Sequence, residues 1–141
     1  MKKILFVILA LVLSIPSFAQ LRTANARDLK PKTTNKGVWT QGMITDVYSG
    51  SQRIGKVEVS FIGSAFRLEN QTSQPLRLVV TGQATDKNGT VNFTFSPKLL
   101  QPGNIDTYSY WCNDPNIVKQ DRKIDDKSMN GVKIYSIKIV R

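Results

Sequence analysis

The amino-acid sequence predicts an all-β protein, a β-sandwich of six or seven strands. Short segments that alternate apolar and polar residues recur along the chain, and turns rich in Gly, Pro and Asn separate them. After the N-terminal apolar run, no segment shows a convincing apolar period of a helix. A length of 141 residues suits one domain. A small β-barrel fits the same pattern and is the alternative architecture.

A hairpin at the centre of the chain carries the strongest signal. Apolar residues occupy every second position in both arms, 76–80 and 91–95, which places each apolar row on one face. Between the arms stands Asn88-Gly89, a dipeptide favoured in tight hairpin turns because it tolerates positive φ. We therefore expect Phe93 of the second arm to be buried with the apolar residues of the first.

The other predicted strands lie at residues 38–48, 55–70, 104–112 and 132–140. Gly42 in the first of them indicates a bulge or a close backbone approach. The apolar phase of residues 55–70 changes at Gly63-Ser64, so either a bulge or a tight turn between two strands is expected there. The terminal strand is expected at a sheet edge, where Lys133 and Lys138 would discourage pairing with other chains.

The N-terminus resembles an export signal. Lys2 and Lys3 precede an apolar run over residues 4–15, and small residues follow it, so residues 1–19 are expected to be a signal peptide cleaved before Gln20. An uncleaved anchor is the alternative, although a membrane span needs about 20 apolar residues. We expect residues 20–36 to form a flexible basic lead and residues 37–141 the β-sandwich domain. The protein would then be periplasmic or extracellular in a Gram-negative-type bacterium.

The net charge indicates what kinds of partner suit the surface. The chain has 20 basic and 10 acidic residues, and loss of the signal peptide with its two lysines leaves a net charge of +8. A cationic surface attracts anionic partners at long range, and the same charge also suits a solvated, soluble surface. We expect a protein or glycan partner, anionic partners included, no specific recognition of nucleic acid, and membrane contact only during export.

The residue inventory argues against catalysis. There is no His, which excludes Ser-His and Cys-His nucleophiles and imidazole metal sites. Cys112 is the single cysteine, so the chain has no internal disulfide, and the thiol is either buried or free to pair with another chain. Asp121, Asp125 and Asp126 alternate with basic residues in the long polar segment 113–130, which favours a solvated, self-paired loop over a calcium site. We expect no enzyme activity, no cofactor and no metal.

Aromatic side chains are the remaining candidates for binding. Aromatic rings can stack on sugar rings or form a protein interface. Tyr135 is one such residue, in addition to the four candidates named below. If neighbours in a strand alternate, Cys112 and Trp111 point to opposite faces. We expect the thiol in the core and Trp111 outside; the reverse arrangement would expose the tyrosines and the thiol. The candidate ligand-binding residues are Trp39, Tyr108, Tyr110 and Trp111.

Three turn segments, Asn70-Gln71-Thr72, Asp86-Lys87-Asn88-Gly89 and Leu100-Gln101-Pro102-Gly103, resemble those of exported bacterial immunoglobulin-like domains of the FxLYD type. The resemblance covers residues 57–112, and the F-x-L-Y-D sequence itself is absent. It implies an immunoglobulin-like sandwich in a binding or accessory role, and it carries over no catalytic residue. The expected function is an exported, non-enzymatic module that recognises a protein or glycan. The alternative is an assembly subunit of a cell-envelope complex whose terminal strand pairs with a neighbour's sheet.

Overall fold

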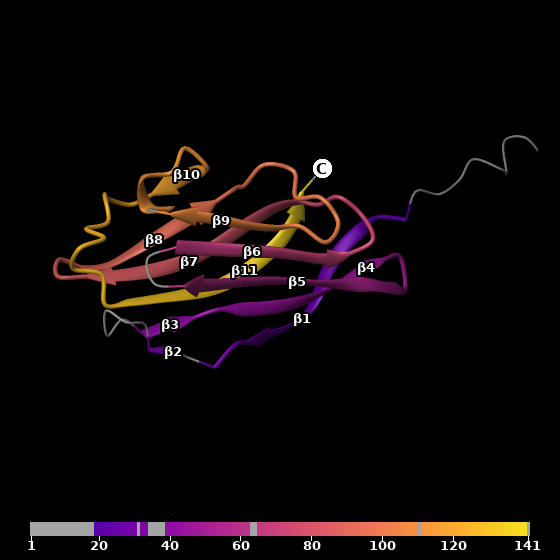
Figure 1. The fold of residues 1–141 in the computed structure, drawn as a ribbon, viewed down its shortest axis with the longest axis horizontal. Helices are drawn as coiled ribbons and strands as arrows, with labels where there is room; N and C mark the ends of the chain where they lie inside the picture. The colour runs from indigo at the N-terminus through magenta and orange to yellow at the C-terminus, as the bar shows by residue number, and fades with distance from the viewer. Residues whose placement is uncertain (1–18, 31, 34–38, 63–64, 110, 141) are drawn as a thin grey trace, which may run out of the picture.

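A computed structural model describes residues 19–30, 32–33, 39–62, 65–109 and 111–140, and it shows two β-sheets packed face to face (Figure 1). The elements are β1 (Leu21–Asp28), β2 (Lys32–Thr33), β3 (Trp39–Gln41), β4 (Met43–Ser49), β5 (Gln52–Ile62), β6 (Ala65–Thr72), β7 (Arg77–Asp86), β8 (Gly89–Phe95), β9 (Ile105–Ser109), the 3-10 turn η1 (Trp111–Asn113), β10 (Ile117–Gln120) and β11 (Gly131–Val140). The predicted all-β sandwich is confirmed, and the sheets do not close into a barrel.

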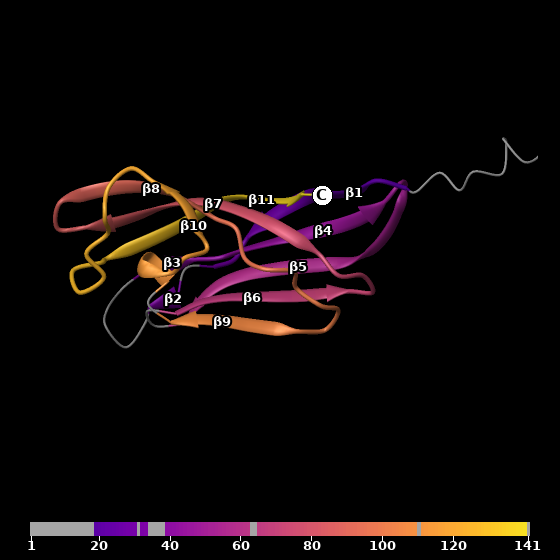
Figure 2. The same ribbon diagram turned by 90° about the horizontal axis from the view of Figure 1, so that it is seen from above.

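The strand count exceeds the predicted six or seven: the described residues form eleven strands. The predicted strands 38–48 and 55–70 each divide into two, and β1, β2 and β10 lie in segments that were predicted to be irregular. The first sheet has the order β1-β4-β5-β6-β9, and the second sheet has the order β10-β8-β7-β11-β3-β2. Figure 2 shows the layers edge-on, with β7 and β8 in one and β5, β6 and β9 in the other.

The predicted central hairpin forms as β7 and β8. In β7–β8, Asp86 pairs with Gly89 across the turn, and the positive φ of 107° falls on Gly89 rather than on Asn88. The phase change at residues 63–64 separates β5 from β6, which pair from Gly55–Thr72 to Ile62–Ala65, so of the two expected possibilities the structure has two strands. Each strand thereby keeps one regular apolar face.

Gly42 is where the chain crosses from one sheet to the other. β3 before it belongs to the second sheet, and β4 after it belongs to the first. A Cβ at residue 42 would lie 2.5 Å from the carbonyl oxygen of Val59. The predicted close backbone approach is therefore confirmed, and only glycine fits at this position.

The core lies between the sheets and is centred on aromatic rings. Phe93, Leu78 and Val80 are buried together, as the hairpin pattern predicts. The ring centroid of Trp111 lies 4.6 Å from that of Phe93 and 5.9 Å from that of Phe66 on the opposite sheet. η1 thus contributes a large side chain that touches both layers.

The predicted flexible lead is wrong for residues 21–28, and the domain therefore begins before residue 37. These residues form β1, which pairs antiparallel with β4. Arg27 and Arg53 both donate to the buried carboxylate of Asp46, with the closest N–O distance 3.0 Å in each pair. Because β1 carries few apolar residues, this ion-paired cluster fixes it to the sheet.

The predicted signal peptide lies outside the described residues except for Ala19. Within the described ranges, no helix has the length and apolar character needed to span a bilayer.

The terminal strand is not an edge strand, contrary to prediction. β11 lies between β7 and β3, pairing with β7 along almost its whole length and with β3 at residues 131–133. On the side away from β7, the Thr23 hydroxyl of β1 donates to the Ile137 carbonyl at 2.9 Å. The edges of the sandwich on the opposite side are β9 and β10.

The long polar segment is also more ordered than predicted. Its β10 pairs with β8, and Arg122 after it binds both carboxylate oxygens of Asp86 in the hairpin turn, at 2.6 and 2.7 Å. The segment therefore pairs with the hairpin as well as with itself, and it carries polar side chains to the outer face of the second sheet.

Candidate functional site

The structure places Trp111 in the core, so its predicted position on the outer face is wrong. Its side chain is 1% exposed, and Cys112 beside it is also buried, as predicted for the thiol. Both residues belong to η1 rather than to a strand, so the alternation of faces does not apply to them. The 3-10 turn allows both side chains to enter the same core.

The other predicted aromatic residues have different surroundings. Tyr108 on β9 is half-buried, and its ring packs edge-on against Phe95 with centroids 5.0 Å apart. Burial raises the pKa of Tyr108 to about 12. The side chains of Trp39 and Tyr110 lie outside the described residues. Tyr135, the remaining aromatic candidate, is 46% exposed on the outer face of the second sheet.

Tyr135 begins a row of hydrogen-bonded side chains that crosses three strands, which we call the polar row: Tyr135, Gln83, Asn92 and Asp121. The Tyr135 hydroxyl donates to Gln83 Oε1. Gln83 Nε2 donates to Asn92 Oδ1 at 2.9 Å, and Asn92 Nδ2 donates to Asp121 Oδ2 at 2.8 Å. Strand register produces this row, because Gln83 and Asn92 are paired residues of β7 and β8.

The carboxylate at one end fixes the direction of every bond in the polar row. Asp121 only accepts when ionised, so Asn92 must turn its NH₂ group toward it and its oxygen toward Gln83. Gln83 must therefore donate its NH₂ group to the Asn92 oxygen, and its own oxygen then accepts from the Tyr135 hydroxyl. The phenol oxygen keeps its lone pairs for a ligand, and Asp121 Oδ1 has no partner among the residues that the structure describes.

A second row lies one rung away and consists of Ser136, Thr81, Thr94 and Lys119, which are register partners on neighbouring strands. The hydroxyl oxygens of Thr81 and Ser136 are 2.6 Å apart. We call this the hydroxyl row.

A surface depression of about 240 Å³ lies over the two rows. Its lining includes Thr81, Asn92, Thr94, Lys119, Asp121 and Tyr135. Gly82 and Phe93 also line it. A Cβ on Gly82 would lie 2.7 Å from the Phe93 ring, so the sheet and the core ring below it are closely packed here.

The chemistry available in the depression is that of polar recognition. It offers hydroxyl and amide groups that both donate and accept, a carboxylate, an ammonium group and part of an aromatic ring. Binding sites for polar small molecules and sugars combine such groups. Within the described ranges, no group of three acidic or thiol side chains is placed to hold a metal ion.

The two buried aspartates of the described chain are occupied by structural contacts. Hydrogen bonds from Arg27 and Arg53 hold the pKa of Asp46 below its usual range. Hydrogen bonds from Arg122 and from the Asp125 N–H hold the pKa of Asp86 well below its usual range. Both carboxyl groups are therefore ionised at neutral pH and cannot act as general acids there.

Comparisons with protein-family models, with curated proteins and with solved structures give no match. The likeness to FxLYD-type domains therefore stays a prediction. Two of its three turn segments do meet in the structure, since buried Asn70 donates to the carbonyl of Leu100 at 2.9 Å and its own carbonyl accepts from the Gly103 N–H at 2.8 Å. These bonds connect the end of β6 to the segment before β9 and do not involve the depression.

Sequence reasoning concentrated on aromatic residues and missed most of the site. The signal was present in the hairpin, where Thr81, Gln83, Asn92 and Thr94 occupy the parity opposite to the apolar residues. The face of the hairpin formed by these positions carries uncharged polar residues in the middle of both strands. This is unusual for a face that only needs to be solvated. Lys119 and Asp121 had no local signal, because their position depends on β10 returning beside β8.

Proposed function

We propose that this protein is an exported, non-enzymatic module that binds a glycan on the outer face of its second sheet. The polar row is the observation that carries the proposal. Its groups are held in place before a ligand arrives, so little side-chain entropy is lost on binding. Sugars present rings with hydroxyl groups at their edges, and the site offers a matching set of donors and acceptors beside the exposed ring of Tyr135.

The absence of histidine and the ionised state of Asp46 and Asp86 support a binding role over a catalytic one. The apolar N-terminal segment supports export, which would give such a module access to envelope or environmental polysaccharides. A β-sandwich with a polar, slightly hollowed sheet face suits an extended ligand, because neighbouring strands supply contacts at regular spacing.

The test is a binding screen against immobilised neutral and charged polysaccharides, followed by calorimetric titration of the ligands that bind. Tyr135→Ala should weaken binding about ten-fold or more, which corresponds to about 1.4 kcal/mol. Tyr135→Phe keeps the ring and loses one hydroxyl, so a smaller loss of about 0.5–1.5 kcal/mol is expected.

Tyr48→Ala is the matched control, because Tyr48 is a partly exposed tyrosine of the first sheet, under the guanidinium of Arg22 at 4.6 Å. It should leave the affinity unchanged. Absence of binding to every polysaccharide, or equal losses in the Tyr135 and Tyr48 variants, would contradict the proposal. A folded-state check by circular dichroism accompanies each variant.

The alternative, assembly through the terminal strand, has less support. That mode needs an open strand edge, whereas β11 pairs with β7 on one side and, at residues 131–133, with β3 on the other, and the Thr23 hydroxyl binds its Ile137 carbonyl.

A further inference from the structure

We infer that the polysaccharide bound by this face is anionic. This inference rests on the proposed glycan-binding function and narrows it to one chemical class. It starts from a difference in charge between the outer faces of the two sheets.

Among the described residues, the second sheet presents cations that have no acidic partner. Lys133 lies between buried Val132 and Ile134, so its side chain points outward, and Arg77 lies in the same way between Leu76 and Leu78. Lys138 follows buried Ile137, and Lys119 lines the depression itself. None of the four exposed cations forms an ion pair within the described part of the chain: Arg77, Lys119, Lys133 and Lys138.

The first sheet differs because its strands carry as many acidic as basic residues, namely Asp28, Asp46, Glu58, Glu69 and Asp106 against Arg22, Arg27, Arg53, Lys56 and Arg67. Arg27 and Arg53 share Asp46, and Arg67 pairs with Glu69 at 3.3 Å. Excess positive charge is therefore concentrated on the face that carries the polar row. Around the depression, Asp121 is the acidic residue, and the polar row already engages one of its oxygens.

The arrangement fits an acidic polysaccharide better than a nucleic acid. A nucleic acid has a charge on every phosphate and binds through dense cationic contacts and stacked bases. Here the depression combines one lysine with a carboxylate, hydroxyls and amides. A polysaccharide with carboxylate or sulfate groups supplies hydroxyls for the polar and hydroxyl rows, and spaced charges for Lys119 and Lys133. The Lys133 ammonium lies 5.6 Å from the Tyr135 ring centroid, so the aromatic and cationic contacts adjoin.

The experiment compares matched ligands that differ in charge alone: polygalacturonate with its methyl ester, and dextran sulfate with dextran. In at least one pair the charged member should bind about ten-fold tighter at low salt. The difference should shrink between about 0.01 M and about 1 M NaCl, since the Debye length falls from about 30 Å to about 3 Å. Single-stranded DNA is titrated as a third ligand.

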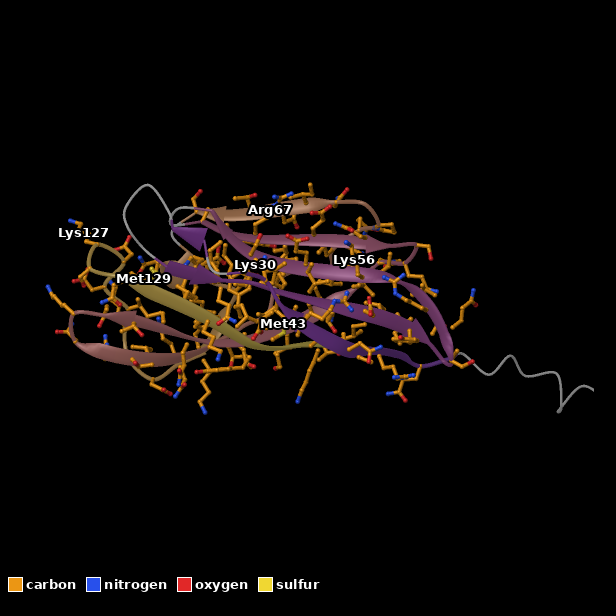
Figure 3. All side chains as sticks on the ribbon, turned by 90° about the horizontal axis from the view of Figure 1, so that it is seen from below. Lys30, Met43, Lys56, Arg67, Lys127 and Met129 are labelled. Atoms are coloured by element: carbon orange, nitrogen blue, oxygen red, sulfur yellow. The ribbon has the colours of Figure 1, made fainter. Side chains whose placement is uncertain are left out.

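Variants that remove positive charges test which residues produce the preference for charged ligands. Lys119→Gln with Lys133→Gln should lower affinity for the charged member about ten-fold, and for the neutral member by a smaller factor because Lys119 also lines the depression. The control removes two charges from the first sheet, Lys56→Gln with Arg67→Gln, and should have little effect (Figure 3).

Several outcomes would overturn the inference. Equal binding of charged and neutral members refutes it and leaves the proposed function standing, whereas no binding in either pair, together with an empty polysaccharide screen, refutes both. Equal losses in the two double variants, or DNA binding of equal strength that Tyr135→Ala does not weaken, would indicate general attraction of polyanions.

Discussion

Phe93→Ala tests the packing beneath the candidate site. Phe93 is 2% exposed, and its ring centroid lies 4.6 Å from that of Trp111. Its paired residue on β7 is Gly82, where the Phe93 ring leaves no room for a side chain. Truncating a buried Phe to Ala costs about 3–5 kcal/mol through lost burial and the cavity left behind. The aromatic contact with Trp111 contributes about 0.5–1.5 kcal/mol of stability beyond that from burying apolar surface. Because two sheets and η1 surround the ring, collapse into the cavity is limited, and we expect about 4 kcal/mol.

The measurement is urea unfolding followed by tryptophan fluorescence, with the m-value checked for constancy so that the change in midpoint reports stability. Val118→Ala is the control, since Val118 is 64% exposed and its loss should change stability by no more than about 0.5 kcal/mol. A loss below about 1 kcal/mol for Phe93→Ala would refute the assignment of this ring to a tightly packed core.

Three further predictions concern the thiol, the hairpin turn and the N-terminus. Cys112 should label slowly with a thiol reagent in the native state, because burial raises its pKa; fast stoichiometric labelling would contradict this. Asp86 has a lowered pKa when folded, so its contribution to stability is present above pH about 4 and lost as the pH falls further. Asp86→Asn should therefore flatten the dependence of the unfolding free energy on pH below pH about 4. Parallel pH profiles of the variant and the wild type would contradict this prediction. Mature protein recovered from the envelope should begin at Gln20 on N-terminal sequencing, and an intact Met1 would contradict export by cleavage.

The sandwich could be predicted because its strongest hairpin is specified by local sequence. Alternation in β7 and β8 and the Asn-Gly turn between them act over a few residues, and the structure has the predicted strands and faces. The sheet crossing at Gly42 and the division of residues 55–70 into β5 and β6 were also visible locally, as a glycine and as a change of phase.

Predictions that depended on distant contacts failed. β1 has little apolar periodicity, and it is ordered by pairing with β4 and by the cluster of Arg27, Asp46 and Arg53. The terminal strand was expected at an edge because it ends the chain, yet position in the sequence does not determine position in a sheet. Trp111 and Cys112 were assigned to opposite faces by an alternation that ends where β9 gives way to η1.

The candidate site shows why register matters more than composition for recognising such a surface. Gln83 and Asn92 become partners because the hairpin turn fixes which residues of β7 and β8 face each other, and a shift of one residue would turn one of the two toward the core. Asp121 can orient Asn92 only because β10 pairs with β8 immediately before it. A variant that moves this register, such as one residue inserted between Lys87 and Asn88, should separate the polar row without changing a single member of it. Glycan binding should then be lost where the hairpin re-forms in the shifted register, whereas Tyr135→Phe should only weaken it. Comparing the two changes separates the contribution of the oriented row from that of any one side chain.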